Sequence, residues 1–149
     1  MKKFNFPLDT VLNYKDQVLE NLKSEHAQIL ATVAQQEKRI EELMEQSRSA
    51  TVRYREDTYL GITVNIMREY ERYITCIQQK IVAEQGVLLK LKRKEEEKRS
   101  EVIEAKKDKT SIDKLKEKKL VQYNKEMLKS EELFIEEFVS NAMVAHGNR

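Results

Sequence analysis

The sequence contains very few of the residues that interrupt regular structure. Its 149 residues include three glycines, one proline and no tryptophan. Compact domains with many turns usually need glycine, proline, asparagine and aspartate at those turns, so this scarcity argues against a fold built from many short elements. Charged residues make up 36% of the chain and hydrophobic residues 40%. That balance is typical of long, partly exposed helices and not of a thick globular core.

Groups that could carry catalysis or hold a cofactor are also scarce. Cys76 is the only cysteine, and His26 and His146 are the only histidines. One cysteine excludes an internal disulfide, and two histidines far apart on different helices make a poor metal site. The glycine- and histidine-based motifs for phosphate, dinucleotide or zinc binding are missing. We therefore expect no enzyme, catalytic residue, cofactor or metal, and we interpret His26 as a polar residue of a helix seam and Cys76 as structural.

No segment suggests export or a membrane span. The basic residues Lys2 and Lys3 are not followed by an apolar run of signal-peptide length, and no stretch approaches the roughly 20 apolar residues that cross a bilayer. The net charge is +2 and both signs are interleaved, so no general field attracts nucleic acid. We expect a cytoplasmic protein without direct membrane insertion, associated with the inner face of the cell membrane only through partners.

Apolar residues recur with a seven-residue period in two long stretches, which predicts coiled-coil helices over about 7–58 and about 64–143. The apolar core positions of the first stretch are Leu8, Leu12, Leu19, Leu22, Ile29, Val33, Ile40, Leu43, Ala50 and Tyr54. Those of the second stretch are Met67, Tyr70, Ile74, Ile77, Ile81, Leu88, Leu91, Val102, Ala105 and Ile112. The polar residues Lys15, His26, Gln36 and Ser47 interrupt the first seam.

A turn at about 59–63 is predicted between the two stretches, because Gly61 can adopt a positive φ where the chain reverses. The expected fold is all-α, a long two-helix antiparallel coiled-coil hairpin that forms a single domain over 1–149. Centring the turn on Ile62 places Leu22 opposite Val102 and Tyr54 opposite Tyr70. The same register places Lys15 by Lys109 and His26 by Lys98, which is unfavourable, so a slip by one heptad remains the alternative.

Beyond about residue 116 the first helix has no residues left to pair. The apolar stripe restarts there in a new phase as Leu120, Tyr123, Met127, Phe134 and Phe138. We expect a C-terminal helical overhang that offers this stripe to a partner. The alternative is a separate third helix capped by Thr110 and Ser111.

Charge is unevenly distributed along the second stretch. Residues 90–119 contain 13 lysines and arginines against 8 aspartates and glutamates, whereas residues 126–137 contain five glutamates and one lysine. Three interpretations of the basic part remain open: a solvated flank of the coiled coil, a site for an acidic protein, and a nucleic-acid site. The nucleic-acid site is least favoured, because the segment has no aromatic residue for base stacking.

Three segments of the chain stand out from a generic coiled coil. The chain opens with Phe4-Asn5-Phe6-Pro7-Leu8-Asp9-Thr10-Val11-Leu12, an F-x-F-x-L-x-x-V-L pattern. A basic run, Glu104-Ala105-Lys106-Lys107-Asp108-Lys109, is followed by Leu115-Lys116-Glu117-Lys118 and Tyr123. The ending is acidic and aromatic, with Glu131, Phe134, Glu136, Glu137 and Phe138. Together these segments resemble the flagellar FliJ family, the small coiled-coil components of the flagellar export apparatus.

The resemblance implies a stalk-like protein that enters the hexameric ring of the flagellar export ATPase, links it to the cytoplasmic domain of the export gate and escorts export chaperones. The residues expected at the ATPase ring are Phe4, Phe6, Leu120, Tyr123, Met127, Phe134 and Phe138. Those expected at the export gate are Tyr54, Tyr70, Tyr73 and Ile77. Coiled-coil packing is the alternative role for both clusters. A virulence-type secretion stalk and a dimeric scaffold remain alternative functions, the latter excluded if the free protein is a monomer.

Overall fold

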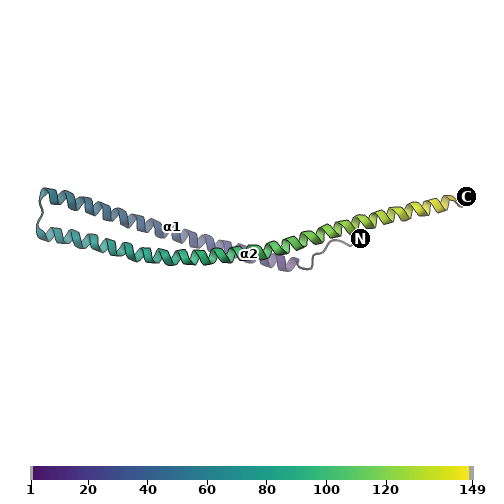
Figure 1. The fold of residues 1–149 in the computed structure, drawn as a ribbon, viewed down its shortest axis with the longest axis horizontal. Helices are drawn as coiled ribbons and strands as arrows, with labels where there is room; N and C mark the ends of the chain where they lie inside the picture. Colours follow the sequence, from purple (N-terminus) through teal and green to yellow (C-terminus); the bar gives the residue numbers. More distant parts are fainter. Residues whose placement is uncertain (1, 148–149) are drawn as a thin grey trace. The chain divides into compact units, whose positions relative to one another are not determined.

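The computed structural model describes residues 2–147 and consists of two long helices joined by a short loop (Figure 1). Helix α1 comprises Asp9–Leu60 and helix α2 comprises Val64–Gly147. No strand occurs among the described residues. The predicted all-α antiparallel hairpin is therefore confirmed, whereas the single domain stays a prediction. Because α2 continues through Thr110 and Ser111, the alternative of a separate third helix is wrong; the Ser111 hydroxyl donates to the Lys107 carbonyl at 3.0 Å instead of capping a new helix.

Local chemistry explains where the two helices begin and end. Pro7 lies in a turn just before α1, and the Asp9 amide donates to the Phe6 carbonyl at 3.1 Å. Gly61 has a φ of 94°, which favours glycine over every other residue, and it ends α1. The Thr63 hydroxyl then accepts a hydrogen bond of 3.4 Å from the Ile66 amide, as an N-cap residue does at the start of a helix. The turn therefore lies where the sequence predicted it.

The two helices contribute to two compact units, each of which pairs α1 with α2. The hairpin unit comprises Glu20–Ile103, and in it the helices run side by side in opposite directions (Figure 1). The terminal unit comprises the described residues up to Leu19 and those from Glu104 onwards. No helix in the part of the chain that the structure describes is long and apolar enough to cross a membrane.

Burial follows the predicted heptads closely. From Leu12 to Tyr54 on α1, and from Met67 to Ile112 on α2, every predicted core position is buried or half-buried. The most deeply buried apolar side chains are Phe6, Leu19, Ile40, Ala50 and Ile77, with between 3% and 6% of their surface exposed. Leu8 is an exception at 37% exposure, because α1 begins after it. A narrow seam, and not a thick core, holds each unit together.

Contacts between the helices identify the register. In the hairpin unit, the rings of Tyr54 and Tyr70 meet edge to face with centroids 5.2 Å apart, as the predicted register requires. The one-heptad slip is therefore wrong.

The unfavourable pairs that this register seemed to create are relieved by neighbouring acids. Lys15 reaches Asp108 at 3.7 Å, and Lys109 reaches Asp16 at 2.8 Å. Long basic side chains reach diagonally past the position directly opposite, so they pair with a carboxylate one residue away.

The second unfavourable pair is resolved in the same way. The Nε2 atom of His26 lies 2.9 Å from Glu95, and Lys98 turns outward to Glu25 at 2.8 Å.

The overhang begins further along α2 than we expected. The first helix does run out of partners at about residue 116, as predicted, because Asp9 at its start pairs with Lys116. The non-helical residues before α1, however, continue along α2. Phe4 packs on Tyr123 with ring centroids 5.4 Å apart. Pairing therefore reaches Tyr123, and from Asn124 to Gly147 every described residue is exposed.

Candidate partner-binding surfaces

The segment before α1 is anchored on α2 by Phe6. This side chain is only 3% exposed, and the Lys116 ammonium lies 6.0 Å from the centre of its ring. Lys116 is held there by Asp9, whose carboxylate accepts a hydrogen bond of 2.8 Å. Phe6, predicted to contact the ATPase ring, is therefore covered by its own chain in this structure.

The first residues of the segment contact Tyr123 more loosely. The Phe4 ring is tilted by 54° against the Tyr123 ring, and the Tyr123 hydroxyl donates to the Lys2 carbonyl at 2.8 Å. Beside this contact lies an open groove of about 450 Å³. Its lining residues are Lys2, Lys3, Phe4, Asn5, Phe6, Pro7, Lys119, Gln122, Tyr123 and Glu126.

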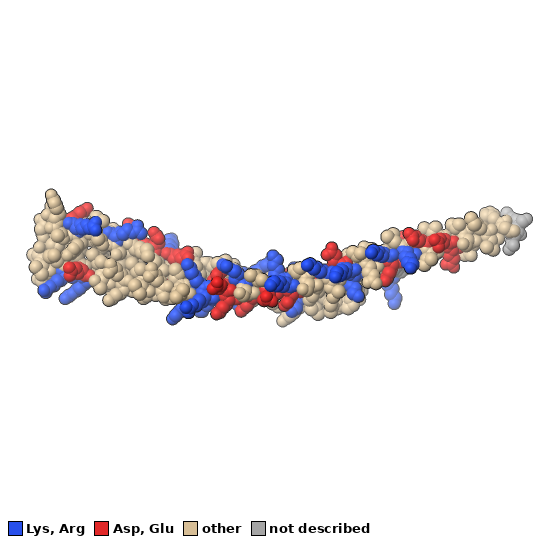
Figure 2. Space-filling view, in the orientation of Figure 1, with Lys and Arg blue, Asp and Glu red and all other residues tan. Residues whose placement is uncertain are grey.

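The last part of α2 exposes large apolar side chains beside acidic ones. Phe134 is 70% exposed and Phe138 67%. Acidic side chains gather on this part of the helix, as Figure 2 shows, and Glu131 borders a shallow groove that also contains Phe134. Leu120 and Met127, at 40% and 38%, are less exposed but still accessible. We call the described residues 124–147 the C-terminal tail.

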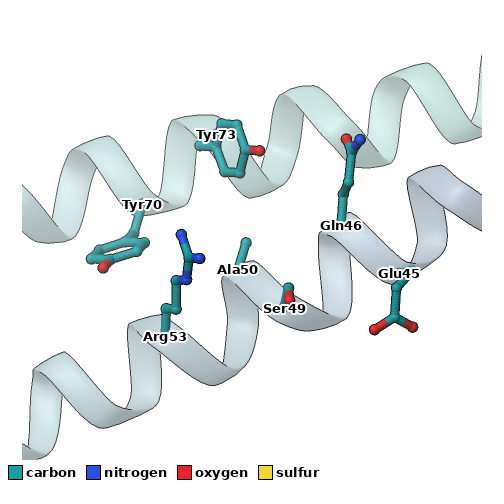
Figure 3. A pocket seen from close by; sticks show the side chains of 7 residues that line it. All are labelled: Glu45, Gln46, Ser49, Ala50, Arg53, Tyr70 and Tyr73. Atoms are coloured by element: carbon teal, nitrogen blue, oxygen red, sulfur yellow. The ribbon is translucent and has the colours of Figure 1, made fainter.

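Near the turn, a shallow groove of about 370 Å³ lies between α1 and α2 (Figure 3). Its lining residues are Glu45, Gln46, Ser49, Ala50, Arg53, Tyr70 and Tyr73. We call it the tip groove. Tyr73 is 53% exposed and offers its ring to solvent, whereas Ile77, one turn further along α2, is only 3% exposed and belongs to the seam.

The residues predicted to contact the gate therefore separate into two roles. Tyr54 and Tyr70 pack on each other, and the Tyr70 hydroxyl also donates to the Asp57 carboxylate. That hydrogen bond stabilises the protonated phenol, so the pKa of Tyr70 is raised above the usual value of 10.0. Tyr73 is the one of the four whose side chain is largely open to a partner.

A family model described as Flagellar FliJ protein matches residues 4–148. The chain belongs to the FliJ family. No curated protein and no solved structure matches it. Membership makes the chain a component of the flagellar export apparatus, which is a non-catalytic role for this family.

The seam of this FliJ-family chain contains one buried acid that sequence reasoning missed. Glu95 is 8% exposed and accepts hydrogen bonds from His26 at 2.9 Å and from Arg99 at 2.6 Å. The hydrogen bond from His26, followed by the contacts with Arg99, holds the pKa of Glu95 below its usual value of 4.5. The sequence signal for this buried ion pair was a glutamate at a core heptad position of the second helix, close to a histidine at a core heptad position of the first.

A second polar contact crosses the same seam. The Gln36 amide donates to the Glu84 backbone carbonyl at 3.0 Å and also to the Glu84 carboxylate. Arg39 adds an ion pair with that carboxylate at 3.4 Å. These contacts favour one alignment of the helices, because a shifted pairing would leave partly buried polar groups without partners.

Six of the 13 lysines and arginines between residues 90 and 119 form ion pairs. Their pairs with acidic residues are Lys92–Glu37, Lys98–Glu25, Lys98–Glu101, Arg99–Glu95, Lys107–Glu104, Lys109–Asp16 and Lys116–Asp9. These pairs support the solvated flank among the three interpretations of this segment. Cys76 is exposed, and it borders a shallow surface groove together with Arg72 and Gln79.

Proposed function

We propose that this FliJ-family chain is a stalk of the flagellar export apparatus that binds the hexameric export ATPase through its terminal unit. It performs no hydrolysis, needs no cofactor and binds no nucleic acid. The observation that carries the proposal is the C-terminal tail, where apolar and acidic side chains alternate along a helix that no other described part of the chain covers.

The chemistry of the tail favours a partner with an apolar groove bordered by basic residues. Phe134 and Phe138 are four residues apart, so they lie on one face of α2 and can enter such a groove together. Burying one such side chain contributes about 1.5–3 kcal/mol, and every 1.4 kcal/mol changes an affinity tenfold. Two exposed phenylalanines are therefore enough to dominate the affinity.

The test is the double variant Phe134→Ser and Phe138→Ser, assayed for binding to the purified export ATPase and for stimulation of its hydrolysis. Both side chains are exposed, so the helix should keep its circular dichroism spectrum. We expect affinity to fall at least about tenfold. The matched control is Leu89→Ser, which removes an apolar side chain that is 55% exposed in the hairpin unit. Equal binding by the double variant and the wild type would place the ATPase surface elsewhere.

We propose further that the tip groove binds the cytoplasmic domain of the export gate and that the same chain escorts export chaperones. Tyr73 supports the gate contact, since exposed aromatic side chains bordering a groove are favoured anchors of protein interfaces. Tyr73→Ala should weaken capture by the gate domain without loss of helicity. Tyr59→Ala is the control, because Tyr59 is 92% exposed but does not line the groove.

The free chain is proposed to be a cytoplasmic monomer that reaches the membrane only through these partners. The intramolecular pairing of α1 with α2 supports this state, since each helix already has a partner for its seam in the hairpin unit. Sedimentation velocity tests it directly. A concentration-independent dimer would favour the scaffold function instead.

A further inference from the structure

The segment before α1 covers part of the same apolar stripe that the C-terminal tail continues. The stripe on α2 consists of Leu120, Tyr123, Met127, Phe134 and Phe138. Leu120 and Met127 are 40% and 38% exposed, whereas Tyr123 between them is half-buried. Both ends of its side chain are occupied, the ring by Phe4 and the hydroxyl by the Lys2 carbonyl. We call residues 2–7 the N-terminal strap.

The two ends of the strap are held very unequally. At Phe6 the side chain is 3% exposed, the ring lies under the Lys116 ammonium, and the Phe6 carbonyl accepts from the Asp9 amide. At Phe4 the hold consists of one tilted ring contact and one hydrogen bond that is exposed to solvent. The outer half of the strap can therefore leave α2 while Phe6 and α1 stay in place.

We propose that the N-terminal strap is a reversible cover, which the export ATPase displaces from Tyr123 when it binds the stripe on α2. This inference rests on the proposed function, because it takes the tail as the ATPase-binding surface. It assigns Phe4 to the cover and not to the ring-binding surface, and it keeps Phe6 as the fixed anchor of the strap.

The position of Tyr123 within the stripe explains why a bound partner would displace Phe4. A partner that packs continuously from Phe134 past Met127 towards Leu120 meets Phe4 on the way. An apolar side chain of the partner can take the place of the Phe4 ring, so the contact that Tyr123 loses is replaced. A partner that grips only the outer tail leaves the strap in place and gains less apolar contact.

The experiment fixes the strap in place by a chemical crosslink. Lys3→Cys and Glu126→Cys are introduced together with Cys76→Ser, because Lys3 and Glu126 line the same groove and Cys76 is the chain's own exposed thiol. A flexible bis-maleimide then joins the strap to α2. The matched control is the same variant with each thiol capped by N-ethylmaleimide, so the substitutions and the loss of both charges are identical. Circular dichroism confirms that both preparations keep their helices.

Binding of both preparations to the purified export ATPase gives the result. We expect the crosslinked protein to bind at least about tenfold more weakly than the capped control. Binding within twofold of each other would overturn the cover, since the strap would then stay in place in the complex. If neither these preparations nor the wild type bound the ATPase, the proposed function itself would fall, and the cover with it.

A second variant tests the cover without any crosslink. Phe4→Ala removes the ring contact with Tyr123 but leaves Phe6 buried, so the strap should open more often. We expect affinity for the ATPase to rise about threefold. A fall in affinity for Phe4→Ala would overturn the proposal by showing that Phe4 itself contacts the ATPase.

Discussion

The substitution Ile77→Ala separates the seam from the tip groove. Ile77 is 3% exposed, and the change to alanine removes three carbon atoms from the seam. At about 0.8 kcal/mol for each buried methylene, the lost burial amounts to roughly 2.4 kcal/mol, and a residual cavity adds to it. A two-helix seam is bordered by water on both sides and can partly close, so we expect a total loss of about 2–3 kcal/mol. Domains of this size have a free energy of unfolding of about 5–15 kcal/mol, so the loss is a substantial fraction of it.

The companion substitution Tyr73→Ala should cost much less. Tyr73 is 53% exposed, and alanine has the higher helix propensity, which offsets part of the lost contact. We expect a loss below about 1 kcal/mol. Urea unfolding followed by circular dichroism measures both, and with a slope of about 1–3 kcal/mol per molar urea the Ile77→Ala midpoint should fall by about 0.7–3 M.

The control for Ile77→Ala is Ile77→Val, which removes one methylene and should cost about 0.5–1.5 kcal/mol. The reasoning is refuted if Ile77→Ala leaves the midpoint unchanged, or if Tyr73→Ala lowers it by the same amount. The first outcome would mean that Ile77 does not stabilise the seam, and the second that Tyr73 stabilises the hairpin as much as Ile77 does.

Three further predictions concern the turn, the seam and the phenol. Gly86→Ala should stabilise the chain by about 0.5–1 kcal/mol in urea unfolding, because Gly86 lies within α2 with open space around it, whereas Gly61→Ala should destabilise it, since Gly61 has a φ of 94°. The pKa of Glu95 is lowered in the folded chain, so its carboxylate stabilises the fold at pH values above the usual pKa of 4.5. This contribution is lost as the pH falls through the folded pKa. Glu95→Gln should therefore be less stable than the wild type near neutral pH, and the difference in stability should shrink below pH 4.5. Asp57→Asn should bring the pKa of Tyr70 down towards 10.0, which a titration of the tyrosine resonances by NMR would measure, with Tyr70 unmoved if the hydrogen bond is absent.

The hairpin could be predicted from the sequence because burial in a two-helix seam repeats every seven residues. The period located Ile77 at a core position, and Gly61 was the residue best suited to the turn. The heptad also placed Ile77 against the other helix, which does not fit the expectation that its side chain is free to contact the export gate. Tyr73, which lies outside the core positions, kept its exposed ring.

The ion pairs and the strap could not be predicted from that period. Lys15 and Lys109 lie near one another as expected, but their carboxylate partners are set by how far flexible side chains reach. The strap is not helical, so a helical period does not describe it. Its own signal was the pair of aromatic residues Phe4 and Phe6 just before the first helix, both of which lie against α2.

The short turn at Gly61 also favours a seam whose two helices come from the same chain. If the turn straightened, the seam that α1 and α2 of the hairpin unit form would be offered to a second copy, and contacts such as Tyr54–Tyr70 would form again between two chains. A linker of a few residues holds its helices at an effective concentration on the order of millimolar, so exchange between copies is disfavoured in dilute solution. A residue at position 61 that favours a continuous helix would make the turn less stable. Domain-swapped dimers would then form more readily in concentrated protein. Gly61 thus favours the hairpin over a domain-swapped pair of chains.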